Sequence, residues 1–208
     1  MSNRFWEEES FISKNRLEAL VDSVFAFAMT LLVLSLAIPT IPGSRAAAEL
    51  PGYIAGMYPQ FLRFLLAFVL LAVFWIIHQR HFRSLHTVDA LVIWLNIGIL
   101  ISIVFLPFTT SVSGNYSNVQ VAVVLFDLNM FVIGLFFTAH WYYITNTPRL
   151  VEPAISERTA RCGTRKSLVT PVVALIAIVL SFFFPGRSSL AYLVIPLGIY
   201  LVGRFWCR

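Results

Sequence analysis

Charged side chains interrupt the long apolar segments of this 208-residue chain, among them Asp22, Arg63 and Asp127. Ionisable groups inside a membrane segment are costly, so they mark either functional groups or paired structural ones. Arg63 and Asp127 fall at similar depths of neighbouring segments, which would let them pair or relay protons. Arg63 can instead extend to the membrane surface, and Asp22 is more typical of an anchor between helices.

Histidines gather near one end of the same segments: His78, His81 and His86, with His140 at a similar depth further along the chain. His78 and His81 are three residues apart, so they share a helical face as metal ligands do. No third ligand follows at a fixed spacing. The pattern therefore favours structural histidines over a metal site.

Sequence patterns of catalysis are absent: there is no P-loop, HExxH, GxSxG or pair of carboxylates. A TVGYG selectivity filter is absent too. Cys162 and Cys207 belong to no CxxC or CxxH pattern, and no disulfide is predicted. We expect neither an enzyme nor a cofactor-binding protein.

The elements that position these residues follow from composition. The chain is 59% hydrophobic and 12% charged with a mean hydropathy of +0.82, against about 25% charged residues in an ordinary globular domain. A membrane-spanning helix needs about 20 mostly apolar residues. We predict an all-α polytopic membrane protein, with a cytoplasmic segment 1–16 and one six-helix domain 17–208. The predicted spans are about 17–38, 56–77, 88–110, 119–144, 168–184 and 190–205, with residues 145–167 as a connecting loop.

Basic residues predict the orientation. Cytoplasmic loops carry an excess of Lys and Arg. With a cytoplasmic N-terminus, twelve basic residues lie on that side, against only Arg45 and Arg187 on the other. The polar start of the chain does not resemble a signal peptide. We therefore expect a multi-pass protein of the cell (inner, plasma) membrane with both termini in the cytoplasm, and not a nucleic-acid-binding protein.

The first apolar segment carries a one-sided pattern. Its members are spaced as one face of a helix, and on its own such a face is more typical of packing than of a pore. They are Ser23, Phe27, Thr30, Leu31 and Leu34.

The segment from Arg16 to Leu34, RLEALVDSVFAFAMTLLVL, resembles the first helix of bacterial members of the transmembrane protein 175 family, the lysosomal potassium channel family. That family reads approximately R-x-x-x-F-S-D here. Arg16 and Asp22 match, whereas Leu20 and Val21 replace the phenylalanine and serine. Further matches follow in the family's order: FWIIHQRHF (74–82), Asp89, WLN (94–96) and LPF (106–108).

The resemblance implies a potassium-selective or weakly selective cation channel, a homotetramer whose first helices line a central pore. It places the narrowest apolar ring at Phe27, a threonine layer at Thr30, and further rings at Leu31 and Leu34. Phe27 is bulkier than the family's aliphatic residue, which affects pore width.

The same resemblance makes Arg16 and Asp22 supports of the pore helix, with Asp22 paired to Arg16 or to a neighbouring His or Asn. The supporting residues are then Arg16, Asp22, His78 and Asn96.

Three other functions stay open. A proton-coupled secondary transporter would use Arg63, Asp127 and the histidines as its relay. A membrane-embedded enzyme would need a convergent nucleophile or metal cluster, and a purely structural membrane protein would need neither. For the channel, the expected partners are potassium ions, the lipid bilayer and copies of the same chain.

Overall fold

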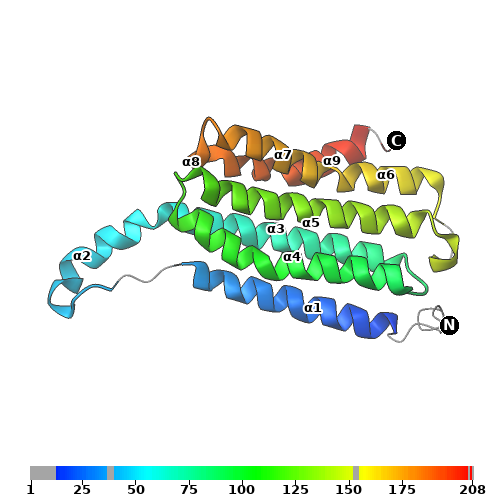
Figure 1. The fold of residues 1–208 in the computed structure, drawn as a ribbon, viewed down its shortest axis with the longest axis horizontal. Helices are drawn as coiled ribbons and strands as arrows, with labels where there is room; N and C mark the ends of the chain where they lie inside the picture. Colours follow the sequence, from blue (N-terminus) through cyan, green and yellow to red (C-terminus); the bar gives the residue numbers. More distant parts are fainter. Residues whose placement is uncertain (1–12, 37–39, 152–154, 206, 208) are drawn as a thin grey trace, which may run out of the picture.

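Long helices lie side by side in the computed structural model, which describes residues 13–36, 40–151, 155–205 and 207 (Figure 1). All regular structure in these ranges is helical. Three short 3₁₀ segments, η1 (Leu32–Ser35), η2 (Pro148–Leu150) and η3 (Ser189–Leu193), join the α-helices. These are α1 (Lys14–Leu31), α2 (Gly43–Gly56), α3 (Tyr58–Arg83), α4 (Ala90–Asn115), α5 (Gln120–Thr145), α6 (Glu157–Ser167), α7 (Val169–Ser181), α8 (Pro185–Ser188) and α9 (Val194–Phe205).

Six helical stretches are long and apolar enough to cross a membrane. Consecutive helices combine in three of them, which are α1 with η1, α6 with α7, and α8 through α9. This confirms the predicted all-α protein with six spans. The stretches are Lys14–Ser35, Tyr58–Arg83, Ala90–Asn115, Gln120–Thr145, Glu157–Ser181 and Pro185–Phe205.

The predicted loop 145–167 was wrong over its second half, because α6 is helical and continues into α7. Ser156 caps its start, since the Ser156 Oγ accepts a hydrogen bond from the Thr159 N–H at 3.3 Å. The Trp141 indole of α5 donates to the Ala160 carbonyl at 3.0 Å. Hydropathy alone misses α6 because its exposed face is strongly polar, while its other face packs on α5.

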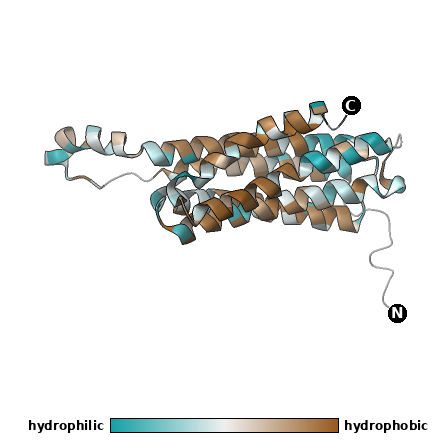
Figure 2. Cartoon of the chain, turned by 90° about the horizontal axis from the view of Figure 1, so that it is seen from above, coloured by the Kyte–Doolittle hydropathy of each residue, from teal (hydrophilic) through white to brown (hydrophobic). Residues whose placement is uncertain are grey.

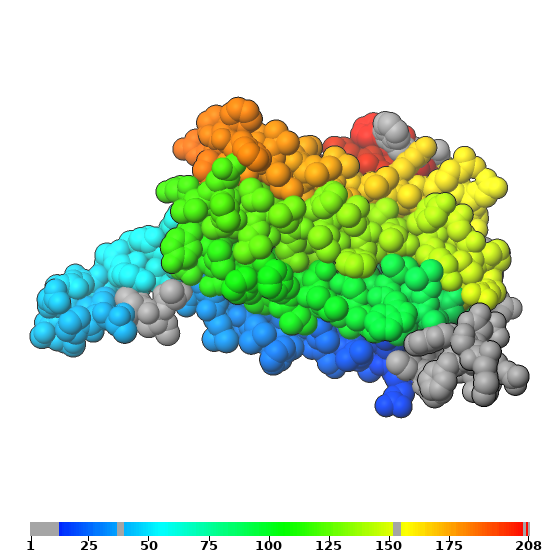
Figure 3. Space-filling model, viewed as in Figure 1, coloured from blue at the N-terminus to red at the C-terminus, as the bar shows by residue number. Residues whose placement is uncertain are grey.

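The helix α2 was not predicted, and none of its residues is buried. It extends beyond the end of the bundle where α3 begins, as the ribbon and the space-filling view both show (Figures 1 and 3). Residues 37–39, which end the predicted first span, lie outside the described residues.

The bundle core lies around α4 and α5, which occupy its middle (Figure 1). Val21, Phe25 and Ala28 of α1 are fully buried in this core. On the other side of α5, α7 approaches closely at Gly134: a Cβ added there would lie 2.5 Å from the Pro171 Cδ. The lack of a side chain at Gly134 therefore sets the spacing of α5 and α7.

A disulfide joins Cys162 of α6 to Cys207 beyond α9, with the two Cα atoms 5.4 Å apart. The prediction of no disulfide was wrong. The two cysteines are 45 residues apart in the sequence, so no local sequence pattern predicts that they pair. It forms because α6 and α9 pack together.

Charge is concentrated at one end of the bundle, which we call the basic end. Here α1, α4 and α6 begin and α3, α5 and α9 end. Figure 2 shows hydrophilic colour at this end and at the opposite end, with the apolar colour between them. At the opposite end the described basic residues are Arg45 and Arg187. The described basic residues of the basic end are Lys14, Arg16, Arg80, Arg83, Arg149, Arg158, Arg161, Arg165, Lys166 and Arg204.

Candidate functional site

One face of α1 is not covered by the chain's own bundle. Phe27 is 60% exposed and Leu34 74% exposed, whereas Val21, Phe25 and Ala28 are buried on the opposite face. The open face carries the five residues that we call the α1 stripe, which are Ser23, Phe27, Thr30, Leu31 and Leu34. Four of them are exposed and Leu31 is half-buried. The four exposed residues therefore do not pack inside this chain.

The two hydroxyls of the α1 stripe are turned back on their own helix. The Ser23 Oγ donates to the Ala19 carbonyl and the Thr30 Oγ1 donates to the Phe27 carbonyl, each at 2.8 Å. A hydroxyl has one hydrogen and two lone pairs. Each of these hydroxyls uses its hydrogen in the bond to its own helix. The Thr30 oxygen is left with acceptor capacity toward the open side, which is the polarity a cation needs.

The end of the first span is tightened. After Leu31 the helix continues as the 3₁₀ segment η1, in which side chains three residues apart eclipse one another. Leu34 therefore stands above Leu31, and the two form one apolar column at the end of the stripe.

Asp22 links α1 to α3. Its Oδ1 accepts hydrogen bonds from the Trp75 Nε1 at 2.8 Å and the Gln79 Nε2 at 2.5 Å. The expected partners Arg16, His78 and Asn96 were wrong for this carboxylate. Neither Trp75 nor Gln79 was predicted as a partner of Asp22. Their spacing of four residues on one helix face was the available signal.

Arg16 is exposed, and no side-chain partner is found for it within the described ranges. The start of α1 is held instead by Lys14, whose Nζ donates to the Leu85 carbonyl at 2.7 Å. Leu17 is buried in a small cluster with Phe82 and Leu85. A supporting role for Arg16 stays a prediction.

His78 and Asn96 do meet, at 2.8 Å between the His78 Nε2 and the Asn96 Oδ1, which joins α3 to α4. His81 contacts His140 instead, with their Nδ1 atoms 3.3 Å apart. A hydrogen bond between two ring nitrogens needs one as donor and one as acceptor, so the pair links α3 to α5 with a single shared proton. No group of three potential metal ligands occurs in the described ranges.

Asp89 closes the basic end. It caps α4 by accepting from the Val92 N–H at 3.0 Å, and it also accepts from the Tyr143 hydroxyl at 2.6 Å and the Arg149 Nη2 at 2.9 Å. Burial alone would raise the pKa of Asp89, but hydrogen bonds from Tyr143, Val92 and Arg149 outweigh it and leave that pKa below its usual value. One carboxylate thus ties the start of α4 to the end of α5.

Arg63 and Asp127 are both buried near the opposite end, and among the described residues they form no ion pair. The Asp127 Oδ1 accepts from the Tyr192 hydroxyl at 2.8 Å. The terminal nitrogens of Arg63 have no hydrogen-bond partner in the described part of the chain.

Together these features define a class: an all-helical, polytopic membrane protein that leaves one face of its first helix open. A family model described as "Endosomal/lysosomal potassium channel TMEM175" matches residues 16–107, which hold the α1 stripe, the Asp22 contacts and the His78–Asn96 pair. The first half of this chain is therefore similar to the TMEM175 family, over residues 16–107.

Individual potassium channels and TMEM175 proteins are similar to a larger part of the chain. A potassium channel of Streptomyces collinus is 28% identical over 150 residues, which are 70% of this chain and 71% of that protein. The crystal structure of a lysosomal potassium-selective channel TMEM175 homolog from Chamaesiphon minutus has a TM-score of 0.76 and 26% identity, covering 92% of this chain and 97% of that one. The rat endosomal/lysosomal proton channel TMEM175 is 25% identical over 97% of this chain but only 41% of its own length.

Proposed function

We propose that this protein is a potassium-permeable cation channel, and that four copies assemble so that α1 of each lines a central pore. One observation carries the proposal: the α1 stripe is apolar, contains a threonine, and faces away from the chain's own bundle. An open face of this kind must meet lipid, another subunit or an axial path. The potassium channel names of the relatives in Streptomyces and Chamaesiphon support the axial path.

The stripe offers a physical basis for selection. A ring of Phe27 side chains removes water from a passing ion without replacing it, and potassium gives up its hydration water more cheaply than sodium. The Thr30 oxygens, one turn further along, can replace some of the lost ligands because their hydrogens are already donated to the Phe27 carbonyl. Apolar constrictions also gate by loss of water.

The basic end is proposed to face the cytoplasm, which follows from the excess of Lys and Arg there. Both ends of the chain then lie on the cytoplasmic side of a multi-pass protein in the cell membrane. No enzymatic step and no cofactor are assigned, since the family and the relatives are ion channels.

The transporter alternative is less well supported. Its proposed relay is split, because Asp127 is bonded to Tyr192 near one end of the bundle while His81 and His140 pair near the other. The comparisons favour a potassium channel over a transporter.

The test is ion flux into liposomes that carry the purified protein, under a potassium gradient and then a sodium gradient, with a protonophore as control. The proposal expects fast potassium flux that needs no proton gradient. Phe27→Ala should increase the flux by widening the ring, while Val33→Ala, an exposed residue off the stripe, should leave it unchanged. Potassium flux that requires a proton gradient would reject the channel in favour of the transporter.

A further inference from the structure

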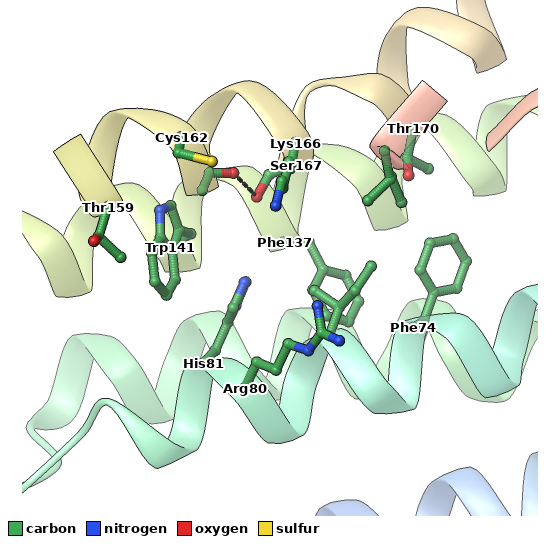
Figure 4. Close-up of a pocket in the computed structure, with 13 residues that line it drawn as sticks. Phe74, Arg80, His81, Phe137, Trp141, Thr159, Cys162, Lys166, Ser167 and Thr170 are labelled. Atoms are coloured by element: carbon green, nitrogen blue, oxygen red, sulfur yellow. Dashed lines mark hydrogen bonds between the residues drawn. The ribbon is translucent and has the colours of Figure 1, made fainter. Parts of the chain in front are cut away.

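A pocket of about 230 Å³ opens between α3, α5 and the helices α6, α7 and α9, away from the α1 stripe (Figure 4). It lies at the basic end. Its walls come from segments more than a hundred residues apart in the sequence, so it is a product of the fold. Nothing in the proposed conduction path uses it.

The pocket has an apolar interior. Phe74, Ile77, Phe137 and Ile199 line it, and Phe74 lies about 9 Å along α3 from the last turn of that helix, at 1.5 Å per residue. This part lies within the candidate spans and therefore at the depth of lipid chains. Such walls favour a hydrocarbon ligand over a hydrated one.

The mouth of the pocket is cationic. Arg80 of α3 and Lys166 of α6 extend toward the same space from opposite walls (Figure 4). Both also line an adjoining hollow of about 610 Å³ that Tyr200 and Arg204 complete. The basic groups therefore converge where the apolar interior opens.

These cations have no acidic partner in the described ranges. Arg204 donates to the Tyr200 hydroxyl at 3.1 Å, a neutral acceptor. Lys166 is half-buried, and its Nζ would lie 3.1 Å from a Cβ added at Gly203, so the ammonium group rests against the backbone of α9. Arg80 and Arg204 are exposed. Like charges that converge on one hollow repel one another, and a bound anion would relieve this repulsion.

We propose that this pocket binds an anionic phospholipid of the leaflet at the basic end. The phosphate lies among Arg80, Lys166 and Arg204, and one acyl chain enters between Phe74 and Ile199. Basic pockets between membrane helices are suited to such headgroups. A free phosphate would contact only the cations. A neutral lipid would contact only the apolar walls. Only an anionic lipid uses both halves of the pocket.

The experiment is a native mass spectrometry titration of the full chain, purified in detergent, with dioleoylphosphatidylglycerol, dioleoylphosphatidylcholine or inorganic phosphate. We expect phosphatidylglycerol to bind more tightly than phosphatidylcholine. Arg80→Gln and Lys166→Gln should each weaken its binding about fivefold, since one Lys or Arg contributes about 1 kcal/mol near an anionic surface. The matched control is Arg187→Gln at the other end of the bundle, which should bind as the unchanged protein does.

A second variant tests the hydrocarbon half. Ile199→Trp keeps every charge but fills the apolar interior, and it should weaken phosphatidylglycerol binding while leaving the thermal stability in lipid-free detergent within a few degrees. Equal binding of the two lipids, or unchanged binding in the Arg80 and Lys166 variants, would overturn the proposal. Phosphate binding that Ile199→Trp leaves intact, with no preference for the lipid, would reduce the site to a small-anion site.

Discussion

The Asp22 carboxylate holds α1 in place through donors that belong to a single neighbour. Trp75 and Gln79 lie one turn apart on α3 and converge on one oxygen atom. The orientation of the α1 stripe therefore depends on a side chain that does not itself lie on the stripe. If the α1 stripe lines a pore, as we propose, the residues that support the pore and those that meet the ion are different sets.

Removing that carboxylate tests the division. Asp22→Ala leaves the Trp75 and Gln79 donors without their acceptor, and an exposed hydrogen bond of this kind contributes about 0.5–1.5 kcal/mol. We expect a lower unfolding midpoint and less assembled protein in size-exclusion chromatography. Ion preference should persist in whatever assembles. Arg16→Ala is the control and should behave like the unchanged protein. A normal oligomer peak for Asp22→Ala would contradict this role.

Thr30 is predicted to act on the ion itself. Thr30→Val keeps the shape of the side chain and removes the oxygen. The preference for potassium over sodium should fall by up to about tenfold, corresponding to one or two weak ligand contacts of about 0.5–1.5 kcal/mol. Reversal potentials recorded in lipid bilayers measure this preference for potassium over sodium. Thr30→Ser should retain the preference, and equal reversal potentials for Thr30→Val and the unchanged protein would remove Thr30 from the pathway.

The Asp89 cluster should make stability depend on pH. The pKa of Asp89 lies below its model-peptide value of 3.8, so its ionised form is stabilised by folding. The contribution is complete above about pH 4 and is lost as the pH falls through the lowered pKa. The difference in unfolding midpoint between the unchanged protein and Asp89→Asn should be constant from pH 5 to 8 and shrink in stronger acid. Glu157→Gln, an exposed helix pair, is the control. A difference that grows on acidification would contradict the assignment.

At the scale of elements, hydropathy was enough to predict six spans, because each must be apolar for about 20 residues. It could not predict α6, whose residues from Glu157 onward are mostly polar and whose packing on Trp141 is a tertiary contact. Partners on different helices were equally out of reach. Depth in the sequence suggested Arg63 for Asp127, yet Tyr192, from a short 3₁₀ segment, is the one that bonds it.

The contact between α5 and α7 gives a test of packing. Gly134→Ala places a Cβ 2.5 Å from the Pro171 Cδ and 2.7 Å from the Pro171 nitrogen, so α7 must shift. We expect a loss of about 1–3 kcal/mol, as for other overpacked cores, measured by thermal unfolding in detergent.

The matched control is Gly52→Ala in α2, where nothing lies within 4 Å of the added atom. There alanine should be neutral or slightly stabilising, because glycine is a poor helix former. Equal unfolding midpoints for the Gly134 variant and the unchanged protein would show that the close approach is not required.

At the scale of the whole molecule, the two sides of the bundle differ in how their outer helices are held. On one side the α1 stripe is left uncovered. On the other side the Cys162–Cys207 bond links α6 to the segment after α9. Proteins rarely keep disulfides in a reducing cytoplasm, so with the basic end inside the cell this bond would form only under oxidising conditions.

Reduction should therefore weaken the α6–α9 side selectively. Closing a loop of 45 residues is worth up to about 4 kcal/mol in the chain-entropy account. The unfolding midpoint of the oxidised protein should fall on adding dithiothreitol, whereas that of Cys207→Ser should not change. If reductant leaves the unchanged protein unaffected, the bond contributes nothing to its stability.

Both ends of the described chain, Ser13 and Cys207, lie at the basic end of the bundle (Figure 1). Two copies could thus be joined head to tail by a linker that never crosses the bilayer. Two such fused pairs would supply four first helices, with the number of altered subunits fixed by the gene. A single altered ring position could then be placed in one, two or four subunits, which turns the stoichiometry of the pore into something that can be counted.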